Sequence, residues 1–169
     1  MENKMFQKVN ELLEKYIGGQ IFFSELDNAV KFDEEILTQL LTKANTIKNA
    51  YPNPQDILTI ASGEIGLSLH NLGIPVDFLV KGGLRHNPND INLKPFSDKI
   101  KNKSFIFIDD SYFSGKTLQV IKEEIERLGG KIIFSIVAYD GSRTKDDFVY
   151  SLYRYYDHYD ILGRPLKKD

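Results

Sequence analysis

The stretch that decides the fold of this 169-residue chain is Phe105-Ile106-Phe107-Ile108-Asp109-Asp110-Ser111-Tyr112-Phe113-Ser114-Gly115-Lys116-Thr117. Its four leading apolar residues predict a buried strand that delivers two carboxylates to the edge of a sheet. A small polar turn follows. Apolar residues then recur at helical spacing and predict a helix from about Gly115 to Leu128, which Gly129-Gly130 ends. We therefore read the stretch as a strand, a turn and a helix.

The turn within this stretch has the chemistry of an anion site. The first backbone N–H groups of a helix have no partner inside the helix, and the macrodipole there is positive. Ser111, Ser114 and Thr117 add hydroxyl groups, and Gly115 allows close approach of the backbone. Such a pocket suits a phosphate, and two adjacent acids suit ribose hydroxyls or a hydrated Mg²⁺ ion. The plainer alternative is that the serines cap the helix and the acids are solvated.

The remaining elements alternate in type along the chain. We expect helices at about Met5–Tyr16, Asp33–Asn49 and Ile65–Leu72, and strands at Ile57–Ile60, Val76–Val80 and Ile132–Ala138. The polar segment Lys81–Lys103 predicts a long functional loop with one helical turn near its end. The aromatic tail, Phe148–Tyr159, is interpreted as an antiparallel edge strand or hairpin.

This alternation predicts an α/β fold with a mainly parallel central sheet and helices on both faces. We expect one domain over residues 1–169, with helices or a small variable hood at 1–50, a core at 57–140 and an aromatic edge at 141–169. Ligands of such sheets bind beyond the carboxyl ends of the strands. The loops at Ala61–Glu64, Lys81 onward, Asp109–Thr117 and Tyr139 onward should therefore share one edge.

Composition narrows the function classes. A net charge of −2 gives no basic field for nucleic acid, and Lys99, Lys101 and Lys103 are interpreted as a solvated helix end. The chain has no cysteine, which excludes thiol chemistry and suits a cytoplasmic protein. No apolar run is long enough for a membrane span, and the first residues do not resemble a signal peptide.

The quoted stretch resembles the signature of type I phosphoribosyltransferases: four apolar residues, two acids, three variable residues, Ser or Thr, Gly, any residue, Thr. Ser114 stands in the usual threonine place. A Walker P-loop is the alternative, because Ser114-Gly115-Lys116-Thr117 ends like one, but that motif needs glycine where Asp110 stands. The resemblance spans roughly Ile57–Asp140 and implies a type I phosphoribosyltransferase fold.

The resemblance also implies roles for individual residues. Asp109 and Asp110 would bind the ribose hydroxyls of phosphoribosyl pyrophosphate and hold Mg²⁺ through water, in the family's manner. The 5-phosphate would lie against Ser111, Tyr112, Phe113, Ser114, Gly115, Lys116 and Thr117. The pyrophosphate would lie against Ala61, Ser62, Gly63 and Lys81. Lys81, Arg85 and His86 would supply catalytic cations, as in the mobile loop of orotate phosphoribosyltransferases, which also suggest a homodimer.

The acceptor is a nitrogenous base whose identity these patterns leave open. Tyr139 and Asp140, taken to lie in the loop after the fourth strand, are the expected base contacts. Hypoxanthine and guanine enzymes carry an aspartate where this chain has Phe113, which argues against their chemistry. We therefore expect a phosphoribosyltransferase. The alternative is a non-enzymatic sensor with the same fold, which the missing acceptor residues and Glu64 beside the pyrophosphate loop keep open.

Overall fold

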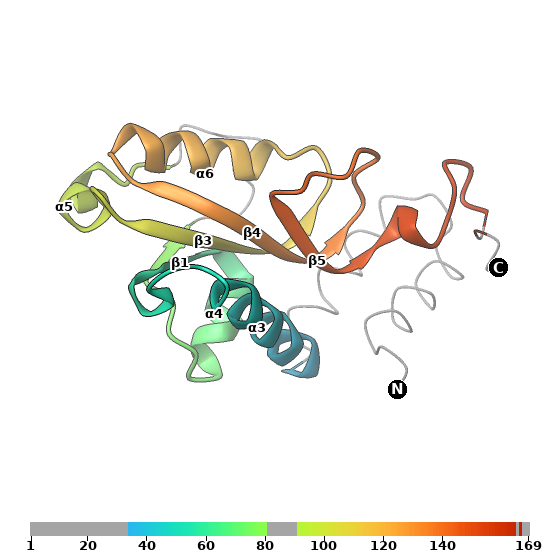
Figure 1. Ribbon diagram of the computed structural model, residues 1–169, viewed down its shortest axis with the longest axis horizontal. Helices are drawn as coiled ribbons and strands as arrows, with labels where there is room; N and C mark the ends of the chain where they lie inside the picture. The colour runs from blue at the N-terminus through green and yellow to red at the C-terminus, as the bar shows by residue number, and fades with distance from the viewer. Residues whose placement is uncertain (1–33, 81–90, 165, 167–169) are drawn as a thin grey trace.

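The computed structural model describes residues 34–80, 91–164 and 166, and these form a layered α/β unit around a five-stranded sheet (Figure 1). The strands lie in the order β2-β1-β3-β4-β5, and every neighbouring pair is parallel. The strands are β1 (Leu58–Ser62), β2 (Phe78–Val80), β3 (Ser104–Tyr112), β4 (Lys131–Asp140) and β5 (Val149–Arg154). The helices are α3 (Glu34–Lys48), α4 (Gly63–Asn71), α5 (Ser97–Ile100) and α6 (Lys116–Arg127), with short 3-10 turns at Pro54–Asp56, Lys94–Phe96 and Tyr155–Asp157.

The alternating side chains of β3 explain why helices cover both faces. Phe105 and Phe107 join one buried cluster with Leu118, Ile121 and Ile125 of α6. Ile106 and Ile108 join the opposite cluster with residues of α3 and α4. Figure 1 shows α6 on one side of the sheet and α3 and α4 on the other. The predicted parallel sheet with helices on both faces is therefore confirmed.

Both central strands are longer than the sequence suggests. We expected β3 to end at Ile108, but it pairs with β4 as far as Tyr112↔Asp140. The two acids of the quoted stretch therefore lie within the strand. Asp and Ser are poor strand formers, yet pairing with a long neighbour outweighs that local preference. Tyr139 and Asp140, which we expected in a loop, likewise lie in β4.

The predicted antiparallel direction of the tail is wrong. β5 is an edge strand, as expected, but it runs parallel to β4, with Val149 opposite Ser135 and Arg154 opposite Asp140. The chain returns only part of the length of β4 before β5 begins. Residues 141–148 can span that distance because an extended chain covers about 3.3 Å per residue. Strand direction was the feature that the alternating pattern could not indicate.

Candidate functional site

Asp109 and Asp110 lie at the carboxyl end of β3, on opposite faces of the sheet. Asp109 faces the α6 side and is 8% exposed, whereas Asp110 is partly exposed. The backbone N–H of Asp110 donates to Oδ1 of Asp109 at 2.8 Å, and the N–H of Ser111 donates to Oδ1 of Asp110 at 2.9 Å. Of the two predicted ribose ligands, Asp110 is therefore the more accessible.

Burial and a like-charged neighbour change the acidity of Asp109. Desolvation is the largest cause, and the charge of Asp110 adds to it, so that the pKa of Asp109 lies well above its ordinary range. Hydrogen bonds from the Asp110 backbone and the Ser62 side chain oppose this rise. The surroundings of Asp109 therefore disfavour its charged form.

The start of α6 is open to solvent, as the phosphate site requires. Gly115 is the N-cap residue, and its φ of 78° is a left-handed conformation that suits glycine. A Cβ at this position would come within 2.8 Å of the Tyr112 hydroxyl oxygen. Ser114 and Lys116 on either side are exposed, and the Lys116 N–H lies 3.4 Å from Ser114 Oγ. The first turn of α6 thus presents its positive end to the sheet edge.

The β1–α4 turn reaches the same edge. Ser62 ends β1 and is the N-cap residue of α4, which begins at Gly63. The Ser62 side chain is buried and is engaged with Asp109, and Ala61 lies in the core. The contribution of this turn to a pyrophosphate would therefore come from backbone N–H groups. The expected cations Lys81, Arg85 and His86 lie outside the described residues, as does the side chain of Glu64.

A cavity of about 540 Å³ lies beside the β3–α6 turn and is lined by Tyr112, Phe113, Ser114, Gly141, Ser142, Arg143 and Thr144. Its two walls are tied together. The Gly141 N–H donates to the Tyr112 carbonyl oxygen at 2.9 Å, and the Tyr112 hydroxyl donates to Asp146 Oδ2 at 3.3 Å. The ring of Phe113 packs against that of Tyr139, with 5.6 Å between centroids. The 111–117 turn and the 141–146 loop therefore form one site.

We expected Tyr139 and Asp140 to contact the base, but neither residue lines this cavity. Tyr139 is 2% exposed, and its ring stacks on Tyr153 with centroids 5.7 Å apart. Asp140 is also buried, and it accepts hydrogen bonds from the N–H and hydroxyl of Ser142. Their contact with a base would have to come through the backbone or through the loop that they support.

The sequence did not identify the other residues that lie at this cavity. Ser142, Arg143 and Thr144 line the cavity, and Arg154 at the end of β5 contacts the loop from behind. The only signal was their place after the fourth strand, where a parallel sheet collects its ligand loops. Nothing in the local pattern brought Arg154 to this loop, because its register with Asp140 depends on tertiary pairing.

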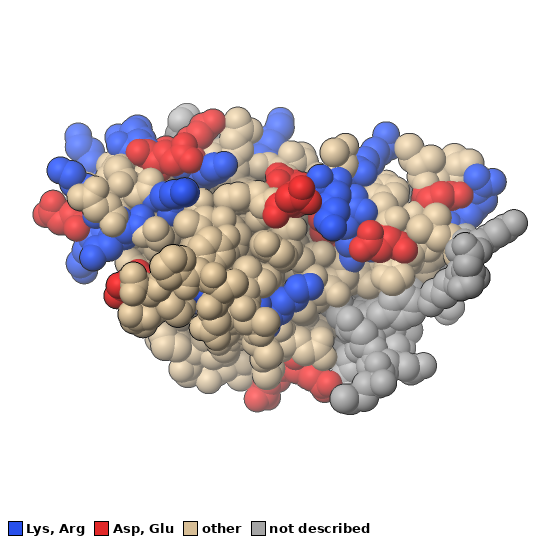
Figure 2. Space-filling view, viewed as in Figure 1, with Lys and Arg blue, Asp and Glu red and all other residues tan. Residues whose placement is uncertain are grey.

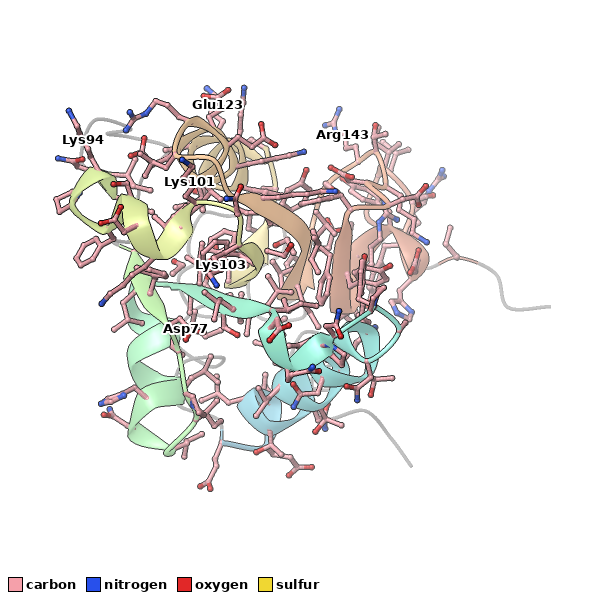
Figure 3. The ribbon with its side chains drawn as sticks, turned by 60° about the vertical axis from the view of Figure 1, so that its left-hand side comes forward. Asp77, Lys94, Lys101, Lys103, Glu123 and Arg143 are labelled. Carbon is pink, nitrogen blue, oxygen red and sulfur yellow. The ribbon has the colours of Figure 1, made fainter. Side chains whose placement is uncertain are left out.

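The predicted solvated lysines lie elsewhere. Figure 2 shows Lys and Arg side chains gathered around α5 and the nearby end of α6, mixed with acids. In Figure 3, Lys94, Lys101 and Lys103 all lie to the left of Arg143. Lys103 directly precedes β3, so it is at the amino edge of the sheet. Within the described part of the chain, no helix is long and apolar enough to cross a bilayer.

The carboxylates of Asp109 and Asp110 suit a magnesium ion that is held partly by the protein and partly by the phosphates of a substrate. Among the described residues, no group of three or more His, Asp or Glu side chains could hold a metal by itself. Mg²⁺ is commonly held by one or two carboxylates together with waters and substrate phosphates. Asp110, the more accessible of the two acids, fits that arrangement.

Solved structures that resemble this chain share its fold at low identity. A hypoxanthine phosphoribosyltransferase from Staphylococcus aureus has a TM-score of 0.50 and 12% identity, covering 72% of this chain and 74% of its own. A purine phosphoribosyltransferase from Pyrococcus horikoshii has a TM-score of 0.44 and 23% identity, covering 72% and 81%. An HGPRT-ase from Leishmania tarentolae in complex with GMP has a TM-score of 0.47 and 14% identity, and the match covers 72% of this chain and 77% of that protein's chain. No family model and no curated protein sequence matches the chain.

Proposed function

We propose that this chain, which has the fold of type I phosphoribosyltransferases, transfers the 5-phosphoribosyl group of phosphoribosyl pyrophosphate to a nitrogenous base. One observation carries the proposal: an acidic strand end, Asp109-Asp110, lies directly before an open helix start at Gly115–Thr117. A sugar phosphate needs both parts, because its hydroxyls donate to carboxylates while its phosphate accepts from N–H groups.

The substrate would lie along the carboxyl edge of the sheet. The 5-phosphate would bind the Ser111–Thr117 turn, and the ribose hydroxyls would bind Asp110, with Asp109 supporting it. The pyrophosphate would reach the backbone of Ala61-Ser62-Gly63 and the cations Lys81, Arg85 and His86. The base would occupy the cavity between Phe113 and the 141–144 loop, which has the volume for a single ring system.

The reaction is a substitution at the anomeric carbon. The bond from that carbon to the pyrophosphate oxygen breaks, a bond to a nitrogen of the base forms, and the base loses a proton. Positive charge develops on the ribose ring, and negative charge develops on the leaving pyrophosphate, where cations and N–H groups stabilise it. When bound, Mg²⁺ would neutralise the pyrophosphate further.

A base screen tests the activity. Phosphoribosyl pyrophosphate and Mg²⁺ are mixed with the protein and with hypoxanthine, guanine, adenine, xanthine, orotate or uracil, and pyrophosphate release is measured. We expect release with one base, abolished by Asp110→Asn. Asp98→Asn is the matched control, because Asp98 is an exposed acid on α5. Equal activity in both variants would contradict the site assignment.

Phe113 favours a second candidate, a sensor that binds the same ligand without turnover. The residue stands where the purine enzymes that the motif resembles carry an acid, and its ring packs on Tyr139. A sensor would bind phosphoribosyl pyrophosphate with the same residues and release no pyrophosphate with any base. Binding without release therefore supports the sensor, and the absence of binding excludes both functions.

A further inference from the structure

Arg154 holds the loop that lines the cavity, although it does not line the cavity itself. Its Nη2 donates to the carbonyl oxygens of Ser142 at 3.0 Å and Arg143 at 3.4 Å. Its Nε lies 3.6 Å from Asp140 Oδ2, and its Nη1 donates to Asp157 at 3.3 Å. One guanidinium thus joins the end of β4, the loop after it and the segment after β5.

Asp140 holds the same loop from the other end. Its Oδ1 accepts the Ser142 N–H at 2.8 Å and the Ser142 hydroxyl at 2.6 Å. Arg154 and Asp140 are opposite each other in the parallel register, so their side chains share one face of the sheet. Between the two, both the N–H and the carbonyl of Ser142 are fixed.

The third support is steric. A Cβ at Gly141 would collide with the ring of Phe113 and would lie 3.0 Å from the Tyr139 ring. The loop backbone therefore lies directly against Phe113, which belongs to the opposite wall of the cavity. Any shift of the loop at Gly141 changes the space beside Phe113, because the backbone at Gly141 lies directly against that ring.

The ion pair between Arg154 and Asp140 is expected to add little to the free energy of unfolding. The side chains of Arg154 and Asp140 are 10% and 2% exposed. Desolvating two charges offsets most of their attraction, and apolar pairs of similar volume are often as stable. The guanidinium offers several donors in a rigid plane, which an apolar pair does not, and it uses them on loop carbonyls. This use favours a role in loop geometry.

We propose that Arg154 is a positioning residue that sets the base-side wall of the cavity through Ser142 and Arg143. The inference rests on the proposed function for the meaning of the cavity as a base site. The contacts with phosphate and ribose would be made by the end of β3 and the β3–α6 turn, and not by the loop that Arg154 holds. Loss of the guanidinium should therefore weaken recognition of the base and spare recognition of ribose 5-phosphate.

The test uses the double variant Asp140→Asn with Arg154→Met. It removes both charges of the buried pair, so that neither is left without its partner. The amide oxygen at position 140 can still accept the Ser142 N–H, so the change isolates the bonds to the carbonyls. Arg154→Lys is the second variant, since one ammonium group cannot reproduce the planar fork. Arg164→Met is the control, because Arg164 forms an exposed ion pair with Asp160 at 2.8 Å.

Two readouts are measured on the full chain. Amide hydrogen exchange of residues 142–144 should become about tenfold faster in both Arg154 variants, with residues 106–108 of β3 unchanged. Affinity for the tightest binder among AMP, GMP, CMP and UMP should fall about tenfold, while affinity for ribose 5-phosphate stays within about twofold. Arg164→Met should match the wild type in both.

Unchanged loop exchange would overturn the inference, and so would an equal loss of affinity for the nucleotide and for ribose 5-phosphate. The inference would also be overturned if the wild-type protein bound none of the four nucleotides more tightly than it binds ribose 5-phosphate. Failure of the proposed function has a separate signature, which is wild-type protein that does not bind ribose 5-phosphate at all.

Discussion

Two neighbouring strands of the sheet carry acids near their carboxyl ends, and the surroundings of these acids differ. At the end of β4, Asp140 is buried beside the guanidinium of Arg154 and is bonded by Ser142. At the end of β3, Asp109 shares its surroundings with a second carboxylate, and burial raises its pKa. A carboxylate held beside a cation is stabilised within the structure, whereas two acids placed together, one with a raised pKa, are a candidate binding site.

The largest effect should come from breaking the β4 pair on one side. Arg154→Met leaves the Asp140 carboxylate buried without its guanidinium, so the free energy of unfolding should fall by about 3 kcal/mol. Urea denaturation measures this loss. Adding Asp140→Asn should restore most of it. If Arg154→Met is as stable as the wild type, burying the Asp140 carboxylate without its guanidinium partner has no cost, which contradicts this prediction.

A change in the β3–α6 turn should affect the ligand more than the fold. Gly115→Ala places a side chain at a φ of 78° and near the Tyr112 hydroxyl. The turn must shift, and affinity for ribose 5-phosphate should fall about tenfold. Calorimetric titration measures it, with Gly73→Ala as control, because Gly73 has a φ of 77° and no atom near its missing Cβ. Equal losses in both would contradict the phosphate site.

The acidity of Asp109 gives a prediction on stability against pH. Because its folded-state pKa is raised, its contribution to stability is present below the unfolded pKa of about 4 and is lost as the pH rises through the folded value. Asp109→Asn removes this loss. The variant should melt a few degrees higher than the wild type at about pH 8, with the difference shrinking toward about pH 4. A constant difference across this range would contradict the raised pKa.

The smallest effect should come from the exposed counterpart of the β4 pair. Arg164 and Asp160 form a shorter ion pair than Arg154 and Asp140, but the Arg164 side chain is 71% exposed. Solvent screens such a pair, so Arg164→Met should leave the melting temperature within about one degree of the wild type. Thermal melting followed by circular dichroism decides this. A shift as large as that of Arg154→Met would remove burial as the explanation of the difference.

The β3–α6 unit was predictable because its signals are local. An apolar run, two acids, a small polar turn and a helical stripe lie next to one another. The helix was found where it was expected, while the strand continues to Tyr112, beyond its predicted end at Ile108. The acids lie near the carboxyl edge of the sheet, as expected, and their role as ligands of a sugar stays a prediction. Their unequal exposure was not predicted, since it depends on how far β4 continues beside β3.

The β4–β5 unit was not predictable in the same way. Alternating apolar residues indicate a strand but not its direction, so the parallel β5 was missed. Arg154 reaches the loop only because that direction sets it opposite Asp140. The roles of Lys81, Arg85 and His86 stay predictions, because they lie outside the described residues.

A calorimetric titration with phosphoribosyl pyrophosphate and Mg²⁺ tests the central claim most directly. It compares the wild type with Asp109→Asn/Asp110→Asn, after circular dichroism has established that both are folded. We predict binding by the wild type and a loss of at least about a hundredfold in the double variant, because two ligands for the sugar and its magnesium are removed. Equal affinity in the two proteins would contradict the account.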